Sequence, residues 1–246
     1  MATPNTGAAL DLRGTMCITS TEAKSLHGRM LKLAVGPADT DGSKAIFVHE
    51  NVLCATSAFF KNAIKSVWKE LREEPETINL FDDNFEIVNA YIHWLYFQKL
   101  PIPDDEYFIF LARAYVFGEK IMDISFKNDL MAGMIALCNK SNKFPSKVMN
   151  IIYEGTIGGS PMRRLLVDID VNFAHEDKGW IQDIQGYTAE ALADVLLAMV
   201  AQRPATKKRP WNDTPHLYME EVAANTEVVV SKPHSEIREG YGDQLI

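Results

Sequence analysis

The stretch AIFVHENVLCATSAFF, residues 45–60, decides the predicted fold. The segment KAIFVHE, residues 44–50, is typical of a β-strand. The segments NVLCATS and SAFFKNAIKSVW that follow carry apolar residues at helical spacing. Ser57 stands where its hydroxyl can accept a hydrogen bond from a free N–H in the first turn of the second helix. The stretch therefore predicts a strand that runs into two short helices.

The same stretch holds a histidine and a cysteine, His49 and Cys54, among apolar side chains. A structural zinc site needs four ligands, and a Cys/His nucleophile needs an orienting group and an oxyanion hole; the nearby sequence supplies neither set. We therefore expect no metal, no cofactor and no catalytic residue. His49 should end the strand and hydrogen-bond backbone at the turn, and Cys54 should be a small core residue. A small Cys/His enzyme is the alternative, and it predicts rapid modification of Cys54 by thiol reagents.

Outward from this stretch, the chain predicts an α+β fold in which helices dominate. RMLKLAVG, residues 29–36, predicts a first strand, which the turn residues PADTDGS join to the second strand in a hairpin. TINL predicts a third short strand. Amphipathic segments follow at residues 82–96, 101–120, 124–139, 145–155, 160–174 and 188–202. Short strands with helices gathered around them, and no βαβ repeat, indicate this fold class.

The predicted helices carry start signals and apolar stripes. The segment DDNFE opens with acidic and Asn caps, in which Asp83 and Glu86 have the spacing of a capping box, and Asp104 is the expected cap of the next helix. That next helix is apolar nearly all round between Tyr107 and Phe117, so we expect it to be central and buried.

The last predicted helix, residues 188–202, has a stripe that needs a packing surface. We expect this stripe to pack on the preceding helices or on a partner. Its members are Leu192, Val195, Leu196, Met199 and Val200.

Composition limits the classes of function. The net charge of −8 argues against a mainly electrostatic nucleic-acid binder. Cys17, Cys54 and Cys138 are odd in number and far apart, which is neither a disulfide framework nor a zinc site. The N-terminus has no apolar signal segment, and the most apolar late run is too short to span a bilayer. We expect a reducing intracellular compartment, the cytoplasm or the nucleus, and no membrane or direct nucleic-acid partner.

Four parts are expected along the chain. Residues 1–27 lack periodicity and should form a flexible arm, and residues 28–140 should form the main domain. Residues 141–202 should form a helical extension, and residues 203–246 a disordered tail.

Four blocks of the sequence, in this order, resemble the BTB (POZ) domain of fungal type. They are FVHENVLCATSAFFKNAI, WKE, INLFDDNFEIVNAYIHWLY and LARAYVFGEKI. The resemblance covers about residues 29–139, and IIYEGTIGGSPMRRLLVDIDV looks like the helical continuation of many such fungal proteins. It implies a small sheet flanked by helices and a protein-interaction domain without a catalytic site. It also implies homodimers or heterodimers, or adaptors that bind a cullin scaffold and present substrates for ubiquitination. The residues that carry the signature are His49, Leu53, Ser57, Phe60, Tyr96, Tyr115 and Phe117.

Two family features can be checked by residue. Many dimeric members have an acidic residue at the start of the first strand and a basic residue after the histidine, and the two charges meet near the dimer interface. Here Arg29 or Met30 takes the first place and Glu50 the second, so the family's charged pocket is absent. These two residues therefore do not themselves support dimerisation in the usual mode.

Cullin-binding members carry an apolar-x-Glu triplet before the third strand, and Trp68-Lys69-Glu70 stands there in this chain. This resemblance makes Trp68, Glu70 and the adjoining Leu71 candidate partner-binding residues. The alternative is that Trp68 merely finishes its helix by packing on Phe60 and Ile64.

Overall fold

The structure is a computed structural model that describes residues 26–37, 44–65, 72, 74–103, 106–140, 146–174, 178–205 and 208–219. The chain divides into two compact units, residues 1–203 and 204–246. Within the described part of the first unit, helices dominate and one three-stranded sheet is present, so the predicted α+β class is confirmed. No helix among the described residues is long and apolar enough to cross a membrane.

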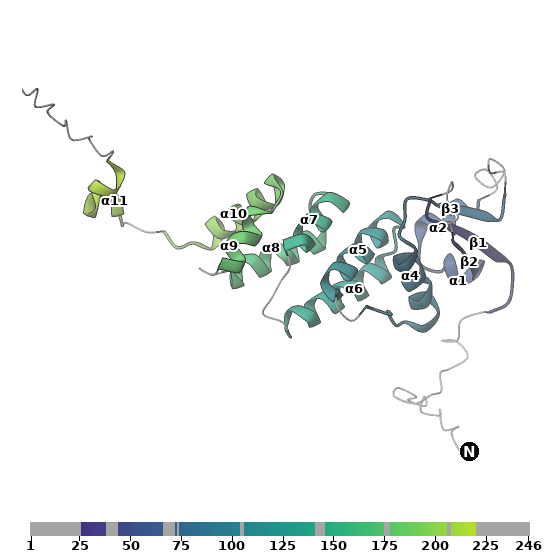
Figure 1. The fold of residues 1–246 in the computed structure, drawn as a ribbon. Helices are drawn as coiled ribbons and strands as arrows, with labels where there is room; N and C mark the ends of the chain where they lie inside the picture. The colour runs from purple at the N-terminus through teal and green to yellow at the C-terminus, as the bar shows by residue number, and fades with distance from the viewer. Residues whose placement is uncertain are drawn as a thin grey trace, which may run out of the picture. The chain divides into compact units, whose positions relative to one another are not determined.

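The sheet has the strand order β2-β1-β3 (Figure 1). β1 (Met30–Val35) pairs antiparallel with β2 (Lys44–His49), which confirms the predicted hairpin strands; the turn residues 38–43 lie outside the described residues. β3 (Thr77–Leu80) pairs parallel with β1, with Leu33 opposite Ile78. The alternate residues Leu31, Leu33 and Val35 are buried, as the period of a strand with one covered face requires.

The two short helices after β2 are present as predicted. α1 (Glu50–Leu53) follows the strand directly, and α2 (Ala58–Ala63) begins after Ser57. The Ser57 hydroxyl accepts from the Phe60 N–H at 3.2 Å, which confirms its role as the cap. The same hydroxyl donates to the Ile121 carbonyl at 2.6 Å, so this corner is tied to the end of a distant helix.

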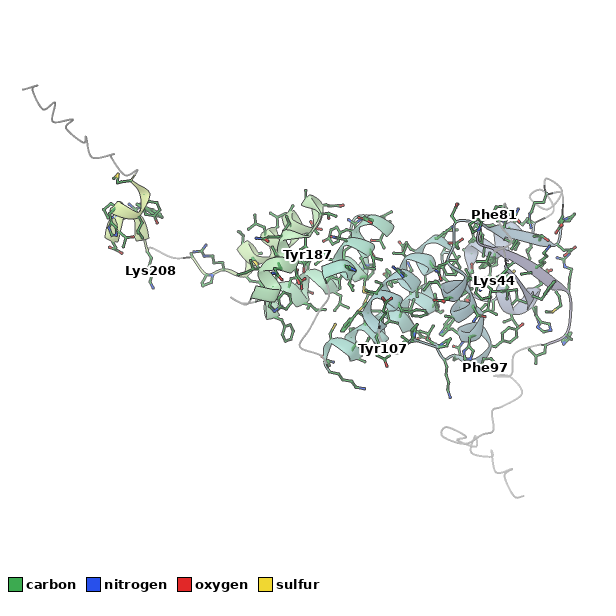
Figure 2. The ribbon with its side chains drawn as sticks, in the orientation of Figure 1. Lys44, Phe81, Phe97, Tyr107, Tyr187 and Lys208 are labelled. Carbon is green, nitrogen blue, oxygen red and sulfur yellow. The ribbon has the colours of Figure 1, made fainter. Side chains whose placement is uncertain are left out.

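α5 (Tyr107–Lys120) is the central helix, as its apolar composition predicts. It packs against α4 (Phe85–Phe97), α6 (Ile124–Cys138) and the first helix of the extension, α7 (Ser146–Gly155). Tyr107 at its start is nevertheless exposed (Figure 2). Gly155 allows the close approach of α7, because a Cβ there would overlap the Val116 methyl groups of α5.

Of two predicted helix caps, Asp83 needs correction and Asp104 stays a prediction. The cap of α4 is Asn84, whose side chain accepts from the N–H groups of Glu86 and Ile87, rather than Asp83. Asp83 instead pairs with Lys120 at 2.8 Å, a contact with the far end of α5 that local spacing does not reveal. Asp104 lies outside the described residues.

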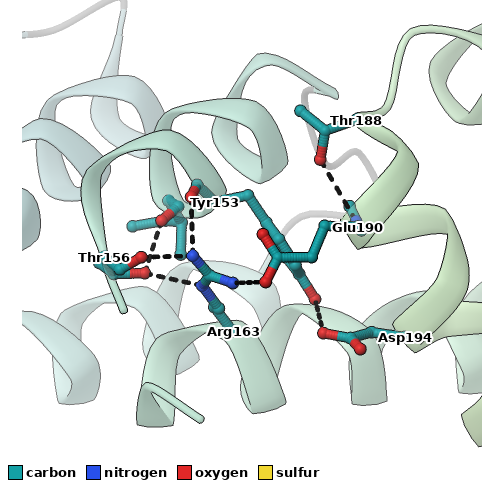
Figure 3. Close-up of polar contacts among 8 residues, drawn as sticks. Tyr153, Thr156, Arg163, Thr188, Glu190 and Asp194 are labelled. Carbon is teal, nitrogen blue, oxygen red and sulfur yellow. Dashed lines mark hydrogen bonds and ion pairs between the residues drawn. The ribbon is translucent and has the colours of Figure 1, made fainter. Parts of the chain in front are cut away.

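The helical extension continues with α8 (Pro161–Phe173), α9 (Lys178–Gln185) and α10 (Ala189–Gln202). A buried arginine, Arg163 of α8, holds three of its helices together (Figure 3). Its guanidinium donates to the Tyr153 carbonyl at 2.7 Å and to the Thr156 hydroxyl at 3.0 Å, and pairs with Glu190 of α10 at 2.6 Å. α9 was not predicted, because eight residues containing a glycine give too short a periodic pattern.

The preceding helices cover only part of the stripe predicted for α10, and Met199 packs against the core as expected. Val195 is buried, as expected, but Leu192, Leu196 and Val200 are exposed, with Leu196 and Val200 each 62% exposed. The packed face contains the buried Ala191 and Val195 and the partly buried Met199, and α10 contacts α8 there.

The tail predicted to lack structure contains two short helical turns among its described residues. These are α11 (Pro210–Asp213) and a 3-10 turn, Pro215–Tyr218. The side chains of Trp211, Leu217 and Tyr218 are exposed. The expected boundaries of the arm, domain, extension and tail otherwise stay predictions.

Candidate partner-binding site

The histidine of the opening stretch has a structural partner. His49 ends β2, as predicted, but its ring contacts a side chain rather than the expected backbone group: Nδ1 lies 2.7 Å from the Tyr96 hydroxyl of α4. The His49 N–H also donates to that hydroxyl, at 3.1 Å. The pair of contacts attaches the end of β2 to α4.

The cysteine of the same stretch is poorly suited to nucleophilic chemistry. Cys54 is half-buried and packs against the core, and burial raises the pKa of its thiol to about 11. Little thiolate therefore forms at neutral pH. Among the described residues, no group of three or more His, Cys, Asp or Glu side chains is placed to hold a metal ion.

Most of the other signature residues lie in the core, which also holds a buried carboxylate, Asp123, that sequence reasoning missed. Leu53, Phe60, Tyr115 and Phe117 are buried, and Tyr96 is half-buried. Asp123 caps α6 through the Phe126 N–H and accepts from the hydroxyls of Tyr91, at 2.8 Å, and Thr56. An aspartate just before a helix signals the cap, but nothing local points to its tyrosine and threonine partners.

The two charges that depart from the family pattern face each other. The Arg29 guanidinium pairs with the Glu50 carboxylate and also with Glu76, at 3.1 Å. Met30, beside Arg29, is exposed, and it is the β-sheet partner of His49. Phe97 is 63% exposed (Figure 2). Its ring lies 6.3 Å from that of Tyr96. We name Met30 and Phe97, with the Arg29–Glu50 pair, the hairpin patch.

An apolar groove of about 520 Å³ lies between α2 and β3. Its lining is mainly apolar and consists of Phe59, Asn62, Ala63, Arg72, Ile78, Asn79 and Met122. The Arg72 guanidinium joins its two sides, because it donates to the Thr77 carbonyl at 2.8 Å and to the Ala63 carbonyl. One bridging side chain therefore fixes the spacing between the helix end and the strand end that form the groove.

In the order of the chain, the candidate partner-binding residues come between Lys65 and Arg72, which the structure describes. Trp68, Glu70 and Leu71 lie outside the described residues, so their roles stay predictions. The described chain leaves α2 through Lys65 and is described again at Arg72, which lines the groove. The residue that follows the candidate segment is therefore part of the groove.

A small sheet flanked by helices, with an apolar groove at its edge, defines a compact α+β domain with a surface suited to contact another protein. The family model of the BTB/POZ domain matches residues 33–125, from within β1 to the start of α6. This domain is a non-catalytic fold that mediates protein–protein interaction. No curated protein matches the chain.

Proposed function

We propose that this chain assembles protein complexes by docking a partner in the α2–β3 groove of its BTB/POZ domain. The observation that carries the proposal is the groove itself, about 520 Å³ and lined mainly by apolar side chains. An apolar cavity rimmed by a few polar groups accepts an apolar anchor residue and orients it by hydrogen bonds. Asn62 and Asn79 supply those polar groups.

The proposal has a direct test in two exposed asparagines. Asn62→Arg places a long charged side chain over the groove, while Asn128→Arg makes the same change on the exposed surface of α6. We expect proteins that co-purify with the wild-type chain to be lost from Asn62→Arg and retained by Asn128→Arg. Identical sets of bound proteins for all three chains would remove the groove from consideration.

A second candidate is a substrate adaptor for a cullin-based ubiquitin ligase. The support is the position of Trp68 and Glu70, a few residues before Arg72 of the groove lining. The resemblance implies a cullin contact at this triplet, and the helical extension or the tail would then recruit the substrate.

Calorimetry with a purified cullin amino-terminal region distinguishes this candidate from other partners. Trp68→Ala and Asn62→Arg should each weaken binding at least ten-fold, as loss of a hot-spot side chain does, while Asn128→Arg should not. Equal affinity of all variants, or no binding by the wild type, would reject the cullin candidate and leave the first proposal to its own test.

Dimerisation of the domain is a further part of the proposal, supported by the hairpin patch. Its two exposed apolar side chains are Met30, the strand partner of His49, and Phe97, whose ring lies 6.3 Å from that of Tyr96. Phe97→Lys should lower the average mass in sedimentation experiments, and Phe81→Lys, at another exposed phenylalanine, should not. Equal average masses for Phe97→Lys and Phe81→Lys would exclude the hairpin patch as the dimer surface.

Two finer assignments belong to the same proposal. The block at residues 151–171 supports a protein of the fungal type, because it looks like the helical continuation of that group. Three scattered cysteines support a reducing location, the cytoplasm or the nucleus.

A further inference from the structure

Most of the exposed side of α10 is apolar, and its exposed charges, Glu190 and Asp194, lie along one border of that side. We define the α10 outer face by apolar residues on the exposed side of the helix: Ala189, Leu192, Ala193, Leu196, Leu197 and Val200. The solvent side of a helix in a soluble domain normally carries charged or polar residues. None of the six residues of this face is charged or polar.

The charges of α10 lie beside this face and are engaged elsewhere. Glu190 pairs with Arg163 at 2.6 Å, and Asp194 accepts from the Tyr153 hydroxyl at 2.8 Å (Figure 3). These contacts fix the rotation of α10 about its axis, together with the buried Ala191 and Val195. The apolar face is therefore held outward by its own chain.

We propose that the α10 outer face pairs antiparallel with the same face of a second copy of this chain. Ala189, Ala193, Leu196 and Val200 are spaced by four, three and four residues, which is the seam of a two-helix coiled coil. A two-fold axis through the middle of the seam places Ala189 opposite Val200 and Ala193 opposite Leu196.

The order of small and large residues is what selects a second copy in this orientation. Each alanine of one helix then faces a larger residue of the other, so the seam fills evenly along its length. A parallel pairing would set alanine against alanine at one end and valine against valine at the other. Leu192 and Leu197 stand at the two edges and cover the seam from solvent.

The size of the face determines how strong the pairing is. α10 has 14 residues and is therefore about 21 Å long, so each copy buries on the order of 300 Å². Stable dimers bury about 800 Å² per partner. The pairing is therefore reversible and depends on protein concentration, and it forms a step distinct from any association of the BTB/POZ domain.

Sedimentation velocity of the full chain over a range of concentrations tests the proposal. The wild-type chain should show a concentration-dependent association step, and Leu196→Glu should weaken the affinity of that step at least ten-fold. Ile157→Glu is the matched control, since Ile157 is 73% exposed between α7 and α8, and it should keep the step. Absence of the step in wild type, or its persistence in Leu196→Glu, would overturn the proposal. Association through the hairpin patch or the groove would be the same in both variants.

A charge pair introduced in two chains tests the orientation. Ala193→Lys alone should also lose the step, since two lysines would face leucines across the seam. An equal mixture of Ala193→Lys and Leu196→Glu chains should regain it, because the introduced lysine of one copy then faces the introduced glutamate of the other. Failure of the mixture to associate, with both variants folded by circular dichroism, would reject the antiparallel pairing.

Discussion

Asp170 of α8 offers a quantitative test of the packing in the helical extension. Its side chain is fully buried, and one carboxylate oxygen accepts from the Tyr187 hydroxyl at 3.2 Å. The other oxygen, Oδ2, has no hydrogen-bond partner. Burial raises the pKa of this carboxyl from 3.8 to about 6; the Tyr187 hydrogen bond offsets part of the rise, and the nearby charge of Asp183 adds a smaller increase.

The raised pKa means that ionised Asp170 destabilises the folded chain. A folded-state pKa above the unfolded value contributes stability that is fully present below the unfolded pKa of 3.8 and is lost as the pH rises through 6. A difference of about two units, at 1.36 kcal/mol each, costs about 3 kcal/mol at pH 7.5. Asp170→Asn removes the charge and keeps an oxygen for Tyr187, while its new N–H groups also lack partners. We expect it to raise the free energy of unfolding by about 2 kcal/mol at pH 7.5.

Urea denaturation followed by circular dichroism measures this effect at two pH values. At about pH 4, where folded Asp170 is already protonated, Asp170→Asn should change the free energy of unfolding little. Asp168→Asn is the control, because Asp168 lies on the exposed side of the same helix and should change stability at neither pH. An Asp170→Asn variant that is less stable at pH 7.5, or equally stabilised at both pH values, would refute the reasoning.

Three further predictions concern packing and reactivity. Gly155→Ala should lower the free energy of unfolding by about 1–3 kcal/mol in thermal denaturation, because the added Cβ collides with α5. Gly158→Ala is the control and should leave stability unchanged, because the space around Gly158 is open. Arg163→Met should lower the free energy of unfolding, measured by urea denaturation, by about 3 kcal/mol or more, because it leaves buried carbonyls unpaired. Arg164→Met, at an exposed arginine of the same helix, is the control. Equal losses of stability in the two variants would contradict the structural role of Arg163. Cys54 should react with a thiol reagent far more slowly in the native chain than in urea, because its pKa is about 11; equal rates would revive the Cys/His enzyme.

The sequence predicted the fold where local signals and burial agree. The strands, the Ser57 cap and the central α5 follow from alternation, capping and continuous apolar character, each readable within a few residues. The capping-box assignment of Asp83 is wrong, because Asp83 and Asn84 are both capable caps and only the start of the helix selects between them. The short α9 was missed, because its stability comes from tertiary packing rather than from its own pattern.

The candidate sites depended more heavily on contacts between distant residues. Sequence resemblance drew attention to Arg29 and Glu50 as departures from a family pattern, but only the pairing of β1 with β2 brings these two charges together. The groove joins α2 to β3 through Arg72, whose two carbonyl partners belong to different elements. Such contacts cannot be read from local order in the chain.

The sequence by itself determined that this chain has a small sheet flanked by helices, since apolar periodicity specifies which elements form and which side each buries. Only the tertiary structure decided which face of α10 is covered. Both faces of that helix are apolar, so its periodicity is satisfied by either orientation. The choice is made by Arg163 and Tyr153, which hold Glu190 and Asp194 and so turn Leu196 toward solvent.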